Sequence, residues 1–146
     1  MFKKIIAKFI GVPANNFHPL AFINGEPEIG KNVYIGCFSI VNAKGAKVAI
    51  GDNCDIASFV SINSADSHRQ TLGQVTEIER GNITLENNVF VGSHCFIGGG
   101  VHIGHHSVVA AGTIITKSCV IPPYSLVVGN PFTVKESYYK NSEKNK

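Results

Sequence analysis

The chain has little net charge and no long hydrophobic run, and each absence excludes a class of protein. Its 13 basic and 10 acidic side chains give a net charge of +3, and no basic stretch is interleaved with aromatic residues, so the composition does not favour a nucleic-acid partner. In the opening segment MFKKIIAKFI, Lys8 interrupts the apolar run, which is too short for a signal-peptide core or a membrane span. We therefore expect no stable membrane insertion.

The opening segment has a different periodicity from the rest of the chain. Its apolar residues are spaced as on one face of a helix: Phe2, Ile5, Ile6 and Phe9. This spacing predicts a short amphipathic helix that caps one end of the molecule, with shallow membrane contact as the alternative.

A period of six residues dominates the chain from Leu85 to Phe132. Every sixth residue is aliphatic: Leu85, Val91, Ile97, Ile103, Val109, Ile115, Ile121 and Val127. A small or β-branched residue follows four places later in the first seven units. Neither a helix of period 3.6 nor an alternating strand explains this period, and a repeat this short indicates a solenoid.

The period has a direct physical explanation. A short extended piece points its aliphatic residue inward, a tight corner follows, and three such pieces make one coil of a triangular prism. Stacked coils then pair as parallel sheets at the usual spacing of about 4.8 Å. Corners need backbone that tolerates unusual dihedral angles, and we expect Gly92, Gly98, Gly104 and the pair Asn87 and Asn88 to provide it.

The four cysteines include no CxxC pair and predict neither a disulfide framework nor a metal site. Cys54, Cys95 and Cys119 fall at the small inward position of the repeat. They are typical of reduced core residues in a cytoplasmic protein.

The repeat divides the chain into three parts. Residues 1–28 are expected to form the cap and an irregular lead-in, residues 29–134 the solenoid, and residues 135–146 a tail with a short helix up to about Lys140 and a disordered end. A small corner loop is expected around Lys44 to Lys47. A polar excursion over residues 63–84 interrupts the solenoid, and such excursions often carry the function of repeat proteins.

The hexads, the segment VVAAGTIITKS and the ending VVGNPFTV resemble the hexapeptide-repeat acyltransferases, in particular the branch that acetylates sugars. The resemblance implies an all-β fold, a left-handed parallel β-helix. It also implies acetyl-CoA as acyl donor, no metal, and a homotrimer whose active sites lie between subunits.

His68, in the sequence ADSHR, matches the general-base histidine of this family. Acetyl transfer from a thioester requires removal of a proton from the attacking hydroxyl or amine, and an imidazole titrates near neutral pH. Asp66, two residues earlier, is a candidate to orient the ring. The alternative is that both are solvated loop residues.

The family places acetyl-CoA in a groove between neighbouring prisms. The small residues at matching positions are Gly92, Gly98, Gly99, Ala110 and Ala111. Lys117 matches a basic residue near the CoA phosphates, and Lys135 is a second candidate. Where many relatives carry a tryptophan, this chain has Phe90.

Polar residues near His68 are candidates to bind the acceptor: Asn42, Asn63, Ser64 and Arg69. The resemblance suggests a hydroxyl of a surface-polysaccharide precursor or the amine of a nucleotide-linked sugar. A histidine base serves both reactions, so it does not distinguish O-transfer from N-transfer.

Two other functions fit the same fold. A γ-type carbonic anhydrase would bind zinc with three histidines, and His102, His105 and His106 lie close together in sequence, although their spacing differs from that family's. A non-catalytic scaffold would use only the prism faces. The histidine-bearing excursion argues against the scaffold.

Overall fold

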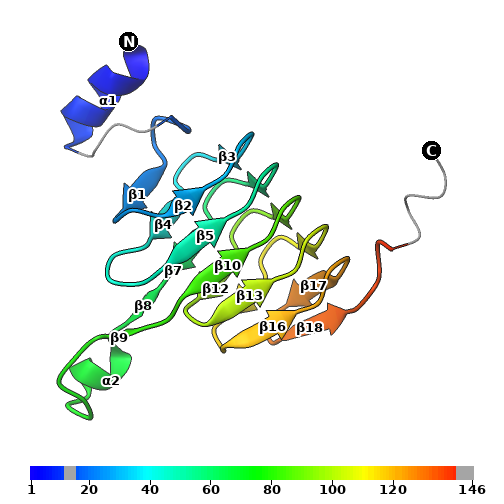
Figure 1. The fold of residues 1–146 in the computed structure, drawn as a ribbon. Helices are drawn as coiled ribbons and strands as arrows, with labels where there is room; N and C mark the ends of the chain where they lie inside the picture. Colours follow the sequence, from blue (N-terminus) through cyan, green and yellow to red (C-terminus); the bar gives the residue numbers. More distant parts are fainter. Residues whose placement is uncertain (12–15, 141–146) are drawn as a thin grey trace.

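The computed structural model describes residues 1–11 and 16–140, and their main feature is a parallel β-solenoid (Figure 1). Three sheets form its walls. The first sheet contains β1 (Phe22–Asn24), β4 (Ile40–Asn42), β7 (Ser61–Asn63), β12 (Phe96–Gly98) and β15 (Ile114–Ile115). The second contains β2 (Glu28–Ile29), β5 (Val48–Ile50), β10 (Ile83–Leu85), β13 (Val101–Ile103) and β16 (Cys119–Ile121). The third contains β3 (Tyr34–Ile35), β6 (Asp55–Ile56), β11 (Phe90–Val91), β14 (Val108–Val109), β17 (Leu126–Gly129) and β18 (Phe132–Lys135).

The solenoid predicted from the period of six is confirmed. The aliphatic residues that open the hexads are buried: Leu85, Val91, Ile97, Ile103, Val109, Ile115, Ile121 and Val127. Of the small residues that follow four places later, Cys119 alone is half-exposed, because its strand β16 is the edge strand of the second sheet. Burial of these aliphatic side chains is the main favourable contribution to folding.

The glycine prediction was wrong about the reason for the glycines. Gly92, Gly98 and Gly104 do not have the positive φ that the corners use; that conformation falls on Asn88, His94 and His106, among other residues. Gly104 is required for a different reason: a Cβ there would lie 2.5 Å from the backbone nitrogen of Pro123 in the next coil. Close stacking of coils, rather than backbone conformation, therefore selects glycine at this position.

The solenoid begins earlier than predicted. Strand β1 lies in the expected irregular lead-in and pairs in parallel with β4, so Phe22 aligns with Ile40. Ala21 is fully buried at the start of this coil. The corner loop expected around Lys44 is present as a turn before β5.

Both ends of the described chain differ in part from prediction. The helix α1 (Phe2–Ile10) is confirmed, but Phe2, Ile5 and Phe9 are exposed rather than packed over the end of the solenoid. At the other end β18 pairs antiparallel with β17. Residues 136–140 form turns instead of a helix, and the expected disordered end lies outside the described residues. Within the described chain, neither helix is long and apolar enough to cross a membrane.

Candidate active site

The excursion leaves the solenoid at one corner and returns to it, as Figure 1 shows at the lower left. After β7 the chain forms β8 (Ala65–Asp66), the single-turn helix α2 (His68–Thr71) and β9 (Glu79–Arg80), and β8 pairs antiparallel with β9. Arg69 donates to Glu79 at 2.7 Å and closes the loop. The repeat resumes at Ile83, which aligns with Val48. The loop therefore has its own hydrogen bonds and is joined at both ends to paired strands of the solenoid.

Asp66 and His68 form the candidate catalytic pair. One carboxylate oxygen of Asp66 lies 2.6 Å from Nδ1 of His68 and also accepts the backbone N–H of His68 at 3.0 Å. A proton on Nδ1, held by the carboxylate, leaves the lone pair of Nε2 free to accept a proton. Both side chains are more than half exposed, so an acceptor can reach the ring.

The pKa of the Asp66 carboxyl is lowered below its ordinary value of 3.8. The first cause is the side-chain hydrogen bond from His68, and the second is the backbone hydrogen bond from the same residue. Because a lowered pKa means that the folded state favours the carboxylate, this contribution to stability is present above the ordinary pKa and is lost as the pH falls through the lowered one.

We expect a carbon-detected NMR titration of the Asp66 carboxyl to show a midpoint below 3.8. In a His68→Ala variant the side-chain hydrogen bond is absent, so the midpoint should rise toward the ordinary value. The same midpoint in both proteins would show that the pair does not exist in solution.

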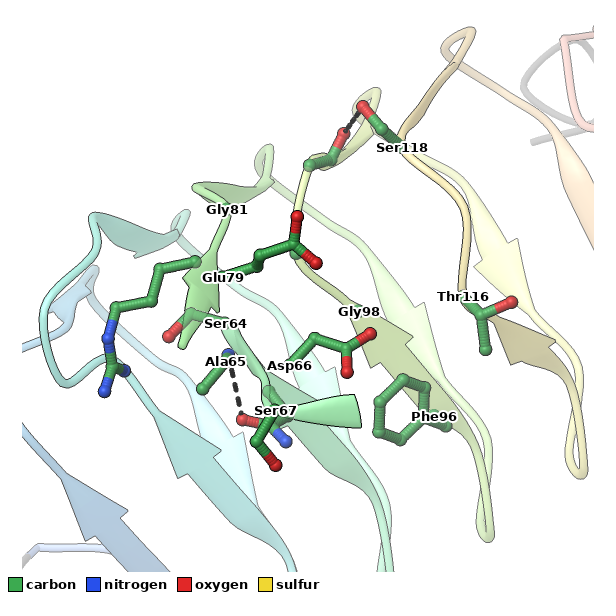
Figure 2. A pocket seen from close by; sticks show the side chains of 14 residues that line it. Ser64, Ala65, Asp66, Ser67, Glu79, Gly81, Phe96, Gly98, Thr116 and Ser118 are labelled. Carbon is green, nitrogen blue, oxygen red and sulfur yellow. Dashed lines mark hydrogen bonds between the residues drawn. The ribbon is translucent and has the colours of Figure 1, made fainter. Parts of the chain in front are cut away.

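A cavity of about 600 Å³ lies beside the base of the excursion, over the first sheet (Figure 2). It is lined by Asn63, Ser64, Ala65, Asp66, Ser67, Glu79, Arg80, Gly81, Phe96, Gly98, Gly99, Gly100, Thr116 and Ser118. His68 is not itself a lining residue; it follows Ser67 in sequence, and its ring is held by the lining residue Asp66. One member of the candidate pair thus lines a space large enough for a small polar molecule.

The structure brings together many of the predicted acceptor-binding residues. Asn63 and Ser64 line the cavity, Arg69 holds the lining residue Glu79, and Asn42 donates to Asn63 at 2.9 Å. The hydroxyl of Ser64, however, is buried and has no hydrogen-bond partner among the described residues. Ser64 therefore contributes to the wall without presenting its side-chain oxygen to a ligand.

The predicted cofactor residues fall into separate groups. Gly98 and Gly99 line the cavity, and Lys117 is exposed between the lining residues Thr116 and Ser118. Gly92 lies at another corner, where a Cβ would meet the backbone of Ala110 and Ala111. Lys135 is in β18, with its Nζ 5.9 Å from the centre of the Tyr138 ring.

Sequence reasoning missed several lining residues. The half-buried Phe96 lines the cavity with Thr116, Ser118, Glu79 and Gly81. Phe96 lies in the first sheet, where it aligns with Ile114, and Thr116 directly follows β15 of the same sheet. No comparable signal identifies Glu79, because the excursion has no period.

The crowded histidines form hydrogen bonds with neighbouring side chains. Nε2 of His102 lies 2.7 Å from a Glu86 carboxylate oxygen, and Nδ1 of His105 lies 2.9 Å from Nδ1 of His106. Over the described residues, no group of three or more histidine, cysteine, aspartate or glutamate side chains is arranged to hold a metal ion.

The comparison with known protein families identifies the repeat. Residues 82–117 match the family model described as the hexapeptide repeat of succinyl-transferase. Residues 82–117 therefore carry hexapeptide repeats. This hexapeptide-repeat protein is 40% identical over 119 residues to the galactoside O-acetyltransferase of Escherichia coli, a match that covers 80% of this chain and 57% of that protein.

Two solved structures extend the likeness to the fold. The polySia-specific acetyltransferase NeuO has a TM-score of 0.66 and 27% identity, over 82% of this chain and 59% of that chain. A hexapeptide-repeat-containing acetyltransferase of Vibrio cholerae, solved in complex with acetyl coenzyme A, has a TM-score of 0.54 and 26% identity, over 78% and 68% of the two chains. In sequence, the match with the E. coli relative spans little more than half of that protein's length.

Proposed function

We propose that this chain is an acetyl-CoA-dependent acetyltransferase that acts on a hydroxyl or amino group of a sugar. The Asp66–His68 pair beside the cavity is the observation that carries the proposal. The names of the E. coli and Vibrio cholerae relatives support acetyl transfer, and the galactoside acceptor of the first supports a sugar. A nucleotide-linked amino sugar or a polysaccharide precursor is the kind of acceptor expected.

In the proposed reaction His68 acts as general base. Its Nε2 takes the proton of the acceptor hydroxyl or amine while the acceptor oxygen or nitrogen attacks the acetyl carbonyl carbon. The C–S bond of the thioester then breaks, and the proton passes from Nε2 to the departing thiolate. Asp66 holds Nδ1 of the ring and stabilises the imidazolium that forms in between.

Acetyl-CoA is proposed to place its acetyl end in the cavity. Gly98 and Gly99 form a wall without side chains. Lys117, exposed between the lining residues Thr116 and Ser118, is proposed to contact a phosphate of the cofactor outside the cavity. Gly92, Ala110, Ala111 and Lys135 lie away from the cavity lining. Their proposed role is to contact the remainder of the cofactor, or the cofactor of a neighbouring subunit.

We also propose a homotrimer in the cytoplasm. Exposed aromatic and aliphatic residues lie on the third sheet and its corner with the first: Tyr34, Phe38, Ile40, Phe59 and Phe90. Phe38 and Phe59 stack with their ring centres 5.4 Å apart. Exposed apolar residues of this kind favour association between copies.

The experiment that tests the function is thiol release from acetyl-CoA in the presence of a panel of sugars. The panel contains methyl galactoside, methyl glucoside, free amino sugars and nucleotide-linked amino sugars. We expect acceptor-dependent release of CoA with at least one member. A hydroxyl acceptor alone would assign O-transfer and an amine alone N-transfer, whereas no release above the buffer rate with any sugar would contradict the proposal.

A further inference from the structure

A row of asparagine side chains leads along the first sheet to the cavity. Asn24, Asn42 and Asn63 occupy aligned positions in β1, β4 and β7. Nδ2 of Asn24 donates to Oδ1 of Asn42 at 3.0 Å, and Nδ2 of Asn42 donates to Oδ1 of Asn63 at 2.9 Å. The three side chains therefore form a ladder in which each amide donates to the next coil.

Backbone hydrogen bonds fix the direction of this ladder. The N–H of Lys44 donates to Oδ1 of Asn42, and the N–H of Ala65 donates to Oδ1 of Asn63, each at 3.2 Å. Oδ1 of Asn42 and Oδ1 of Asn63 therefore each accept two hydrogen bonds. Because only the oxygen can accept, these bonds assign the oxygen and the nitrogen of each side-chain amide. Nδ2 of Asn63 is left on the opposite side of its amide, toward the next coil, without a hydrogen-bond partner in the described part of the chain.

The next position of the ladder is empty because its residue is glycine. Gly98 aligns with Asn63 and lines the cavity. A Cβ at Gly98 would lie 3.2 Å from the carbonyl oxygen of Ile115 and 3.3 Å from the Phe96 ring, so close packing leaves little room for a side chain at this position. We call the gap the part of the cavity lined by Asn63, Phe96, Gly98 and Thr116, where the ladder has no further side chain. Figure 2 shows Phe96, Gly98 and Thr116 around it.

The charges around the gap favour an uncharged ligand. Asp66, Glu79 and Arg80 are the charged residues that line the cavity. Arg69 is paired with Glu79, and Arg80 lies along Gly45 and donates to the carbonyl of Lys44. Both arginines of the excursion are thus engaged by protein partners. The amide donor of Asn63, the hydroxyl of Thr116 and the ring of Phe96 suit the hydroxyl groups and apolar face of a sugar ring.

We propose that the gap over Gly98 is the subsite for an uncharged sugar ring of the acceptor, and that Nδ2 of Asn63 donates a hydrogen bond to one of its hydroxyl oxygens. Asn42 is a positioning residue, because its own amide holds Asn63 in the donating orientation. This inference rests on the proposed sugar acetyltransferase function for its substrate. It adds which part of the cavity binds the sugar and which way the side-chain amide of Asn63 is turned.

The substitution Asn42→Asp tests the orientation of the Asn63 side-chain amide. A carboxylate cannot donate to Oδ1 of Asn63 but accepts strongly from Nδ2, so the Asn63 amide should turn and present its oxygen to the gap. The matched control is Asn32→Asp, which removes the same kind of donor from an inter-coil bond to Asn53 of 3.2 Å at another corner. Asn32 has φ of 54°, a conformation that aspartate tolerates.

For the sugar of the panel that is turned over fastest, Asn42→Asp and Asn63→Ala should each raise the acceptor KM about tenfold, the loss expected for one hydrogen bond. The KM for acetyl-CoA should stay unchanged, and Asn32→Asp should behave as wild type. Unchanged acceptor KM in both ladder variants would overturn the subsite.

A binding measurement separates this inference from the proposed function. The side-chain amide signals of Asn63, assigned by their absence in Asn63→Ala, should shift in an NMR titration of wild-type protein with the panel sugars. A shift without any turnover would contradict the acetyltransferase and leave the sugar subsite standing. Neither a shift nor turnover with any sugar would overturn both.

Discussion

Replacing His68 with alanine is expected to lower kcat for acetyl transfer by about 100-fold or more, because general-base catalysis by a positioned side chain contributes roughly that factor. The loss should fall on kcat rather than on the KM for acetyl-CoA, since the imidazole acts on the acceptor proton. Steady-state thiol release with the best sugar of the panel measures both constants.

The control for this prediction is another exposed histidine. His94 stacks on Phe59 at a different corner, with ring centres 4.9 Å apart, and His94→Asn keeps a residue that tolerates its φ of 60°. This variant should retain the wild-type kcat. Full activity of His68→Ala would remove His68 from the mechanism, and an equal loss in both variants would indicate a structural effect.

The substitution Gly104→Ala is expected to lower the free energy of unfolding by about 2–3 kcal/mol, the range of overpacked sites. The new Cβ would lie 2.5 Å from the backbone nitrogen of Pro123 and 2.8 Å from its Cδ, so two coils must separate locally. Urea unfolding followed by circular dichroism measures the change.

Gly112→Ala provides the matched control. Gly112 has φ of 74° and nothing lies within 4 Å of a Cβ added there, so alanine should cost about 1 kcal/mol through backbone conformation alone. A greater loss for Gly112→Ala than for Gly104→Ala would mean that corner conformation, and not coil stacking, explains the glycines of the hexads.

The period of six made the solenoid predictable because each sixth side chain must be buried in the same core. It could not show why each hexad has its glycine, since a positive φ at a corner and close stacking of coils both select this residue. Gly104 is selected by close stacking and Gly112 by its positive φ. Strand β1 was missed because Ala21 and Phe22 follow a stretch rich in proline, asparagine and glycine, although Phe22 aligns with Ile40.

The site was predictable only where a residue had a chemical or a periodic signal. His68 and Asp66 were found by their chemistry, and their pairing is a local feature of two residues close in sequence. The presence of Asn63 and Thr116 in one cavity depends on which coils stack, and the excursion shifts that register by an amount its sequence does not show. Glu79 enters the cavity through the pairing of β8 with β9.

The central claim, that this chain transfers acetyl groups to a sugar through His68, is tested most directly by product analysis. Wild-type protein and His68→Ala are incubated with acetyl-CoA and the best sugar of the panel, and the sugar is examined by mass spectrometry while free CoA is counted. The account predicts one acetylated sugar per CoA released by wild type and almost none by the variant. CoA release without an acetylated sugar, or the same product yield from both proteins, would contradict it.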